Sequence, residues 1–339
     1  MSPLDSIHQQ CLTTQKSCGF FDHSHHGILK ISGADRIKFL HNILTNDIQF
    51  LKAGRGVRAC FLNAQAQIIA VFDTLAFQDR VLLLTEAPQL SGVQNQLEKL
   101  IIAEQVDVEN VSDRFHLFSV HGPKSEEYLK SIFNQTEPLP KNHPEHINAH
   151  FENSDVVLIR MNLIGDKGYG ILAPRDSEID LKLRLTNLIL ESKFMEIEEP
   201  AFEIMRITGG IPKHGIDYDE TNLPLESHLD ETVSYTKGCY PGQEIIARLD
   251  ARGGVSKKLS GLVLKGELIP KKGDLILDEG IEVGKVTSAA FTPVLKKTVV
   301  LGYLKKDYWM IGHSLVINSE GVEIPVRVEP LPFYTPNSE

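Results

Sequence analysis

The first part of the chain alternates short apolar runs with stretches of helical spacing. Apolar residues bounded by glycines predict a strand over Gly27–Gly33. Ile37, Leu40 and Leu44 share one face at a spacing of three and four residues, which predicts a helix over 34–44. The chain therefore opens with a strand followed by a helix, which is typical of a mixed α and β protein.

The same alternation continues to residue 208. Apolar patterns predict strands over 60–63, 68–77, 81–85, 115–120, 156–161 and 169–172, and helices over 89–102, 123–133, 176–191 and 201–208. The stretch 135–152 is rich in Pro, His, Asn and Glu and is predicted to be a linker or exposed loop. We infer two α+β units before Gly209.

Helical spacing disappears after Lys257. Six short strands are predicted, over 259–265, 275–277, 282–289, 299–304, 314–317 and 323–328. Gly, Pro and Lys separate them, which is typical of a small all-β barrel or sandwich. The tail from Pro330 is predicted to be loose.

Composition and charge exclude some classes of function but do not identify one. The 339 residues are enough for two or three domains, and 42% hydrophobic with 24% charged residues is ordinary for a globular protein. The net charge of −10 argues against a dedicated nucleic-acid-binding protein, which would carry a basic face. The polar start predicts no signal peptide, and no apolar run approaches the ~20 residues of a membrane helix.

Four cysteines, Cys11, Cys18, Cys60 and Cys239, show no CxxC pair and no zinc spacing. We therefore expect free thiols and a cytoplasmic location. Near an N-terminus that we expect to be mobile, Cys11 and Cys18 are interpreted as structural or incidental, as is Cys60.

The most specific segment places one thiol between glycines, next to a cation and an aromatic ring. Its residues are Lys237, Gly238, Cys239, Tyr240, Pro241, Gly242, Gln243 and Glu244, followed by Ala247 and Arg248. Glycines allow tight turns, and Lys237 could favour the thiolate of Cys239. The alternative is a Gly-Pro turn around a buried structural cysteine.

This segment resembles the K-G-C-Y-x-G-Q-E signature of the YgfZ family, folate-binding relatives of the glycine-cleavage T-protein. Shorter matches to the wider superfamily occur in order along the chain. They are Asp22-x-Ser24-x-x-Gly27, Thr45-Asn46-Asp47, Leu62-Asn63, the series Arg206, Gly210, Pro212, Gly215 and Asp217, and Pro224-Leu225-Glu226. The resemblance covers roughly residues 19 to 333.

The resemblance implies an α+β fold with two ferredoxin-like modules around a central folate-sized hollow, followed by a C-terminal all-β barrel. We expect residues 1–50 and 140–235 to form the first module and 51–139 the second. Residues 236–258 are expected to carry the signature motif and a linker, and 259–339 the barrel with its tail.

The resemblance also implies a function. The T-protein moves an aminomethyl-derived carbon from a lipoyl carrier to tetrahydrofolate, using acids in a G-G-x-x-D-D segment. Here the two acid positions hold Ala70 and Val71, which can neither accept a proton nor pair with a cation. Asp73 is displaced by roughly 6–7 Å along an extended strand and is not expected to substitute. Thr208 replaces a further family carboxylate.

We therefore expect a tetrahydrofolate-binding accessory protein that supports assembly or repair of iron–sulfur enzymes, including tRNA-modifying ones, through Cys239. The expected partners are iron–sulfur enzymes or assembly factors, with neither nucleic acid nor membrane bound directly. One alternative is a folate-dependent aminomethyltransferase. Another is a metal protein built on two histidine groups, although neither has a fixed ligand motif. These groups are His23, His25 and His26, and His143, His146 and His150.

Six residues are predicted to line the folate pocket. They are His26 and Phe202 as stacking rings, Asn63 at the pteridine edge, Val71 in the acid position, Arg206 for the glutamate tail and Glu226 for a pteridine N–H. Arg248 is the second candidate for the tail. An internal ion pair is the open alternative for Arg206 and Glu226.

Overall fold

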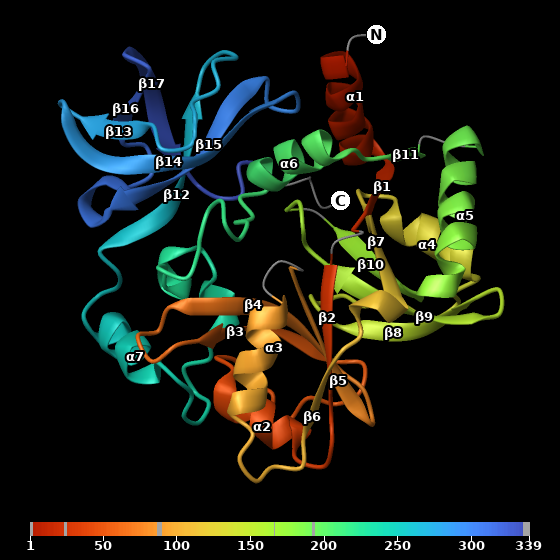
Figure 1. Ribbon diagram of the computed structural model, residues 1–339. Coiled ribbons are helices and arrows are strands. Elements are labelled where there is room, and N and C mark those ends of the chain that lie inside the picture. Colours follow the sequence, from red (N-terminus) through yellow and green to blue (C-terminus); the bar gives the residue numbers. More distant parts are fainter. Residues whose placement is uncertain (1–2, 24–25, 87–89, 166, 192–193, 335–339) are drawn as a thin grey trace.

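The structure is a computed structural model that describes residues 3–23, 26–86, 90–165, 167–191 and 194–334. Three parts surround the middle of the molecule in Figure 1. These are a six-stranded sheet with helices, a five-stranded sheet with helices, and a closed six-stranded barrel. This is the α+β architecture with a C-terminal barrel that the sequence predicts.

The six-stranded sheet has the strand order β11-β1-β7-β10-β9-β8. Its strands are β1 (Cys18–Asp22), β7 (Phe115–His121), β8 (His146–Phe151), β9 (Ser154–Met161), β10 (Gly168–Pro174) and β11 (Phe194–Glu196). Its helices are α1 (Pro3–Lys16), α4 (Ser125–Phe133), α5 (Glu178–Glu191) and α6 (Glu199–Thr208). Phe20 and Phe118 lie in its buried core against α4 and α5 residues such as Leu129 and Leu181.

The five-stranded sheet has the order β3-β4-β5-β2-β6. Its elements are β2 (His26–Ser32), α2 (Arg36–Ile43), β3 (Gly56–Leu62), β4 (Ile68–Ala76), β5 (Arg80–Glu86), α3 (Leu90–Lys99) and β6 (Asp107–Asn110). Leu40 of α2 and Leu97 of α3 pack on one face of this sheet. The other face meets the six-stranded sheet, where Ile28, Leu75, Leu82 and Leu84 share a core with Leu117, Ile159, Met161 and Leu172.

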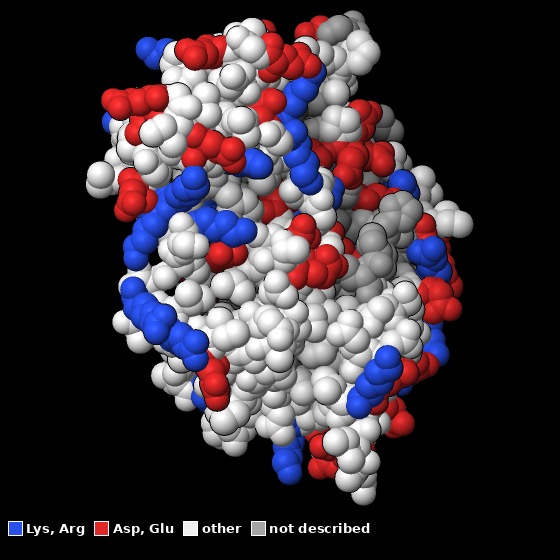
Figure 2. Space-filling view, turned by 60° about the vertical axis from the view of Figure 1, so that its left-hand side comes forward, with Lys and Arg blue, Asp and Glu red and all other residues white. Residues whose placement is uncertain are grey.

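The barrel closes in the order β12-β15-β14-β13-β16-β17. Its strands are β12 (Lys257–Leu264), β13 (Leu275–Asp278), β14 (Ile281–Thr292), β15 (Lys297–Lys305), β16 (Ser314–Ser319) and β17 (Val322–Glu329). They correspond to the six predicted strands. Helix α6 packs against β14 and β15, so it joins the barrel to the six-stranded sheet. Acidic and basic side chains are interspersed on the face shown in Figure 2. Two ion pairs link the first barrel strand to the preceding segment, Lys257 with Glu226 and Lys258 with Asp230.

The division of the chain between the two sheets differs from the predicted one. Strand β2 and helix α2 were expected in the first module, yet β2 pairs with β5 and β6 of the five-stranded sheet. Conversely, β7, expected in the second module, pairs with β1 and β10 of the six-stranded sheet. The chain crosses between the sheets after β1 and again after β6, and local periodicity carries no signal for such a crossing.

Three stretches have more structure than the sequence suggested. The start forms α1, in which Cys11 is 1% exposed and packs against α6, where a mobile segment was expected. The stretch 135–152 contains β8, where Ala149 and Phe151 alternate with exposed residues. The linker 236–258 contains α7 (Gln243–Ala251), begun by Gly242 with a positive φ of 80°.

The first residues of the tail are also held. The backbone N–H of Phe333 donates to the carbonyl of Thr208 at 3.1 Å. Leu331 and Phe333 pack with Ile207 and the barrel residue Leu301. The tail from residue 330 to 334 is therefore ordered, because its apolar side chains cover α6, and residues 335–339 lie outside the described part.

Candidate functional site

A cavity of about 410 Å³ lies between the two sheets and the segment that follows α6. Its volume falls in the range of small-molecule sites, roughly 300–1,000 Å³. The residues that line it come from β3, from the loops before β8 and after β9, and from the segment 209–231, which contains no strand. One residue each comes from the loop after α2 and from the C-terminal tail. The lining residues are Asn46, Gly56, Val57, Arg58, His143, Asn162, Gly165, Gly209, Ile211, Pro212, His228, Glu231 and Pro332.

A charged network forms one wall of this cavity. His143 Nε2 lies 2.9 Å from Asp73 Oδ1, and His143 Nδ1 lies 2.9 Å from the carbonyl oxygen of Arg160. Both ring nitrogens of His143 therefore face a hydrogen-bond acceptor. Arg58 adds a cation, 3.7 Å from Asp73 and 3.2 Å from Glu231.

The carboxylate of Asp73 is held in its ionised form. Burial raises the pKa of Asp73, but the charges and hydrogen bond of His143, with the charge of Arg58, outweigh burial and lower it to about 2. The side chain is 12% exposed. Asp73 is thus a buried, doubly paired carboxylate beside the cavity, and sequence reasoning set it aside only because of its displacement along β4.

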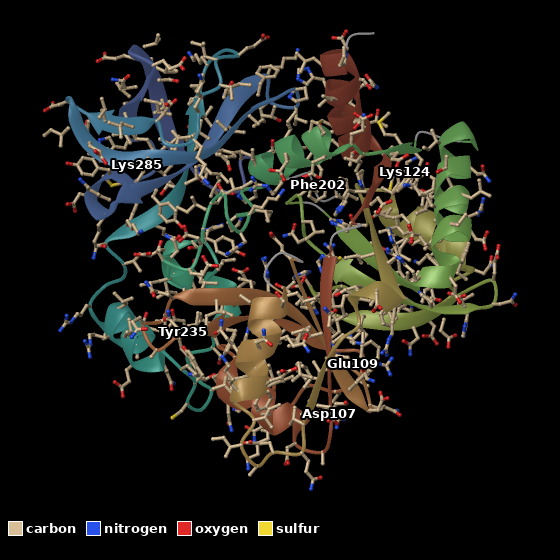
Figure 3. All side chains as sticks on the ribbon, viewed as in Figure 1. Asp107, Glu109, Lys124, Phe202, Tyr235 and Lys285 are labelled. Atoms are coloured by element: carbon tan, nitrogen blue, oxygen red, sulfur yellow. The ribbon has the colours of Figure 1, made fainter. Side chains whose placement is uncertain are left out.

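An aromatic cluster lies beside the charged wall. Phe202 of α6 stacks on Phe21 of β1 with ring centroids 4.2 Å apart. His23 meets Phe202 edge-on at 5.5 Å, and its Nε2 lies 2.7 Å from Ser119 Oγ. Figure 3 shows Phe202 between α6 and the strands of the six-stranded sheet. Phe202 is not among the residues that line the cavity, and Phe21 already covers one face of its ring.

His26 connects the aromatic cluster to the charged wall. Its ring centroid lies 6.2 Å from that of His23, and the charge of Asp73 acts on it. Its Nε2 is buried, with no hydrogen-bond partner among the described residues. Burial lowers the pKa of His26 to about 4, so the ring is neutral at pH 7. An unpartnered buried nitrogen is costly unless a ligand or water satisfies it.

The other predicted pocket residues have structural partners. Asn63 closes the turn between β3 and β4, where its Oδ1 accepts from the N–H groups of Gln65 and Gln67 at 2.9 and 3.0 Å. Glu226 accepts from its neighbour Leu223 N–H at 3.3 Å and lies 3.7 Å from Lys257. Neither side chain lines the cavity.

Arg206 belongs to an internal ion pair. Its Nη1 lies 2.7 Å from Asp217 Oδ2, and its Nε donates to Glu203 Oε2 at 3.0 Å. Arg206 is 4% and Asp217 1% exposed. The guanidinium also reaches Ser288 of the barrel at 3.3 Å. The structural alternative therefore holds for Arg206, while Arg248 is exposed on α7.

The acid positions of the family pattern are filled with core residues. Ala70 is fully buried against α2, and Val71 is 8% exposed in the cluster that includes Tyr218 and Tyr240. The hydroxyl of Thr208 donates to the carbonyl of Ile204 at 2.6 Å, within its own helix. None of these three side chains offers a charge to the cavity.

The signature motif lies away from the cavity, on the end of α2 and the β3–β4 turn. Lys237 donates to the carbonyl groups of His41 and Leu44, and its Nζ lies 5.0 Å from the ring of Tyr240. Burial lowers the pKa of Lys237 to about 8, against the charges of Asp47 and Cys239, which raise it. A Cβ on Gly242 would lie 2.7 Å from the Cα of Ala66, so only glycine fits this contact.

The thiol of Cys239 is exposed, whereas Cys11, Cys18 and Cys60 are buried. Cys239 does not line the cavity, contrary to the predicted orientation toward the central hollow. The remaining motif residues begin α7: Gln243 is half-buried and Glu244 exposed. The motif therefore places one cysteine at the surface, on a loop that Lys237 anchors to the end of α2.

Sequence reasoning missed the cavity residue Arg58 and the buried Tyr218, which lies in the core cluster with Val71 and is not among the residues that line the cavity. Arg58 lies on β3, opposite Asp73 in the register, so a basic residue facing an acid across a hairpin was a usable signal. Burial raises the pKa of Tyr218, whose ring packs near Val71. No local pattern points to Tyr218, because the segment 209–231 has little regular structure.

The histidine groups have unrelated neighbours. His143 pairs with Asp73, whereas the exposed His150 pairs with Asp155 at 2.7 Å, and His25 lies outside the described residues. Within the described ranges, no group of three or more His, Cys, Asp or Glu side chains is arranged to hold a metal ion. None of the helices in these ranges combines the length and apolar character required to cross a membrane.

Two α+β modules, a barrel and a ligand-sized cavity between them define a class of protein that the comparisons identify. Residues 3–237 match the family model of the GCVT N-terminal domain, and residues 257–335 match that of the Glycine cleavage T-protein C-terminal barrel domain. The chain therefore belongs to the glycine-cleavage T-protein family.

Relatives match over nearly the whole chain. An aminomethyltransferase of Halothermothrix orenii is 27% identical over 331 residues, covering 97% of this chain and 91% of the relative. The mitochondrial aminomethyltransferase of Dictyostelium discoideum is 25% identical over 348 residues, covering 98% and 85%. The crystal structure of aminomethyltransferase T from Bartonella henselae has a TM-score of 0.85 at 23% identity, covering 97% and 89%, and shows the same fold.

Proposed function

We propose that this protein is a cytoplasmic, tetrahydrofolate-binding accessory protein of the YgfZ type. It supports the assembly or repair of iron–sulfur enzymes, including tRNA-modifying ones, and does not catalyse the T-protein reaction. One observation carries the proposal. The acid positions of the family hold buried Ala70 and Val71, while the signature thiol of Cys239 is exposed outside the cavity.

The residues present fit a folate. His26 offers a buried nitrogen without a described partner, which suits a pteridine rich in heteroatoms, although it is not among the residues that line the cavity. Phe202 and Phe21 form a stacked aromatic pair that also lies outside this lining. Arg58 lines the cavity and replaces Arg206 as the cation for the carboxylates of the glutamate tail. A bound reduced folate would supply its one-carbon chemistry only where an acid could assist it.

The acids at the cavity are already engaged, and Glu231, which lines it, lies 3.2 Å from Arg58. Asp73 pairs with His143 and Arg58, and its pKa of about 2 makes it a poor proton acceptor at neutral pH. Its role in this proposal is to orient His143 and Arg58 at the cavity wall. Folate thus binds beside a charged network that holds the cavity in shape.

In this proposal the exposed thiol of Cys239 carries the action on iron–sulfur clusters, alongside folate binding. A single cysteine does not hold an iron–sulfur cluster, since clusters are generally bound by about four protein ligands. Cys239 would therefore act on a cluster together with ligands from a partner protein. Its anchored loop and exposed position support contact with such a partner.

An aminomethyltransferase is the second candidate. It is favoured by the names of the relatives and by an ionised carboxylate, Asp73, beside the cavity. This candidate requires Asp73 to leave His143 and act two residues away from the family position.

Replacing the thiol tests the accessory role. We expect Cys239→Ala to change the free energy of unfolding by less than about 0.5 kcal/mol, because the side chain is exposed. It should nevertheless fail to restore iron–sulfur enzyme activity in cells that lack the native protein. Thr236→Ala, an exposed neighbour in the same loop, is the matched control and should complement fully. Full complementation by Cys239→Ala would remove the thiol from the function.

A further inference from the structure

A second cavity, with a volume of about 890 Å³, lies where the turn between β4 and β5 faces β8, the edge strand of the six-stranded sheet. Its volume is in the range of small-molecule sites. It shares no lining residue with the cavity to which folate is assigned above. The proposed function makes no use of this second cavity.

Strand β8 contributes a polar row to the second cavity. His146, Asn148 and His150 lie two residues apart, so their side chains share one face of the strand, and all three line the cavity. His146 is 2% exposed, whereas Asn148 and His150 are exposed. The polar row therefore runs from a buried histidine to the cavity mouth, over roughly 13 Å of strand.

An aromatic and aliphatic wall accompanies this polar row. The ring of Phe77 contacts the ring of His146, with centroids 4.5 Å apart, and the guanidinium carbon of Arg80 lies 4.6 Å from the centroid of Phe77. Other apolar side chains extend the wall. They are Phe115, Val157 and Leu172. The wall suits the flat apolar body of a ring-containing ligand.

The charged groups that line the cavity are mostly acidic. Three carboxylates, those of Asp79, Glu137 and Asp155, stand against the single guanidinium of Arg80, which pairs with Asp79 at 3.0 Å. Asp155 is exposed beside His150. Glu137 is exposed and has no ion-pair partner in the part of the chain that the structure describes. The mouth therefore favours a ligand with a positive charge.

The buried end of the cavity lacks a hydrogen-bond donor. Burial lowers the pKa of His146 to about 4, so at pH 7 its neutral ring has one N–H group and one nitrogen with a lone pair. Neither nitrogen has a hydrogen-bond partner among the described residues. The carbonyl groups of Ala76 and Pro144, which act on this ring, are acceptors and cannot serve the lone pair. A ligand with an N–H or O–H donor would relieve this otherwise costly isolation.

We propose that this cavity binds an aromatic amine. The ligand ring packs on the wall around Phe77, a ring N–H donates to the imidazole of His146, and an ammonium group lies near the carboxylates of Glu137 and Asp155. The acceptor at the buried end and the acids at the mouth select a donor at one end of the ligand and a cation at the other. The inference goes beyond the proposed function and does not depend on it.

Calorimetry with three indole compounds tests each element of this site on the native protein. Tryptamine carries both the ring N–H and the ammonium group. Tryptamine methylated on its ring nitrogen lacks the donor, and indole propionate carries the opposite charge. We expect tryptamine to bind about fivefold more tightly than either compound, because each lacks one of the two polar contacts. Equal affinity of tryptamine and its ring-methylated form, or no heat with tryptamine at millimolar concentration, would overturn the proposal.

Two variants locate the binding. In His146→Leu, which has no acceptor, tryptamine and its ring-methylated form should bind with affinities within about twofold of each other. Asp155→Asn should weaken tryptamine binding about threefold. Glu127→Gln, an exposed acid on α4 outside the cavity, is the matched control and should bind like the native protein. A fivefold preference for tryptamine that persists in His146→Leu would place the ligand elsewhere and contradict the site. If thermal unfolding shows that His146→Leu does not fold, the comparison of ligands on the native protein still decides.

Discussion

Lowering the pH from 7 to 5 should reduce the free energy of unfolding by about 3 kcal/mol or more. Two buried histidines account for this minimum. Burial lowers the pKa of His121 to about 3 and that of His146 to about 4, and both side chains are almost fully buried. With an unfolded pKa of ~6.5, each of these histidines lowers the free energy of unfolding by about 1.5–2 kcal/mol over this pH interval.

The sign follows from proton binding. Between pH 6.5 and 4 these histidines bind protons in the unfolded chain but stay neutral in the folded chain, so stability falls as the pH falls. His26, with a pKa of about 4, and His23, whose pKa burial also lowers, act in the same direction. The paired carboxylates Asp73 and Asp22, each with a pKa of about 2, lose their contribution only below pH 4.

Urea unfolding at several pH values between 5 and 7 measures the effect. His121→Asn should flatten the pH dependence by about 1.5 kcal/mol, because one buried titrating group is removed. His150→Gln, at an exposed ion pair, should leave the dependence unchanged. An unfolding free energy that is equal at pH 5 and pH 7 would show that these rings are not buried in neutral form.

Arg206→Ala should lower the free energy of unfolding by about 3–5 kcal/mol, as expected when one partner of a buried ion pair is removed. Asp217 is 1% exposed, and the donors left to it among the described residues would be the hydroxyls of Thr287 and Ser288 and the backbone N–H of Lys213. The link from α6 to the barrel through Ser288 would also be lost.

Arg248→Ala is the matched control for Arg206→Ala. Both arginines were candidates for the folate tail, but Arg248 is exposed on α7, and its replacement should cost less than about 0.5 kcal/mol. Chemical denaturation of the two variants distinguishes them. Equal stability of Arg206→Ala and Arg248→Ala would contradict the internal ion pair.

Local patterns in the sequence were sufficient for most elements of the fold. The barrel was predictable strand by strand, because Gly and Pro separate six apolar runs whose neighbours pair in hairpins. Helix α3 was equally clear from its apolar stripe. The assignment of strands to sheets was not predictable, because β2 and β7 are placed by chain crossings and by the core shared between Ile28 and Leu117.

The candidate site was predictable only in part. The signature motif was found from its residues, and its exposed cysteine has the accessibility that a functional thiol needs. The cavity wall was not found, because His143 comes from a distant segment and meets the Arg58–Asp73 pair of the β3–β4 hairpin only in the folded protein. Arg206 was ambiguous because a lone arginine in a sequence suits a ligand and an internal partner equally well.

Release of ammonia from an aminomethylated lipoyl carrier in the presence of tetrahydrofolate tests the central claim most directly. Calorimetry should first show that the purified protein binds reduced folate, and the aminomethyltransferase of Halothermothrix orenii serves as the positive control. With Ala70 and Val71 in the acid positions and Asp73 engaged by His143, we predict no turnover above the uncatalysed rate. Turnover comparable to that of the control would contradict the accessory role and establish this protein as an aminomethyltransferase.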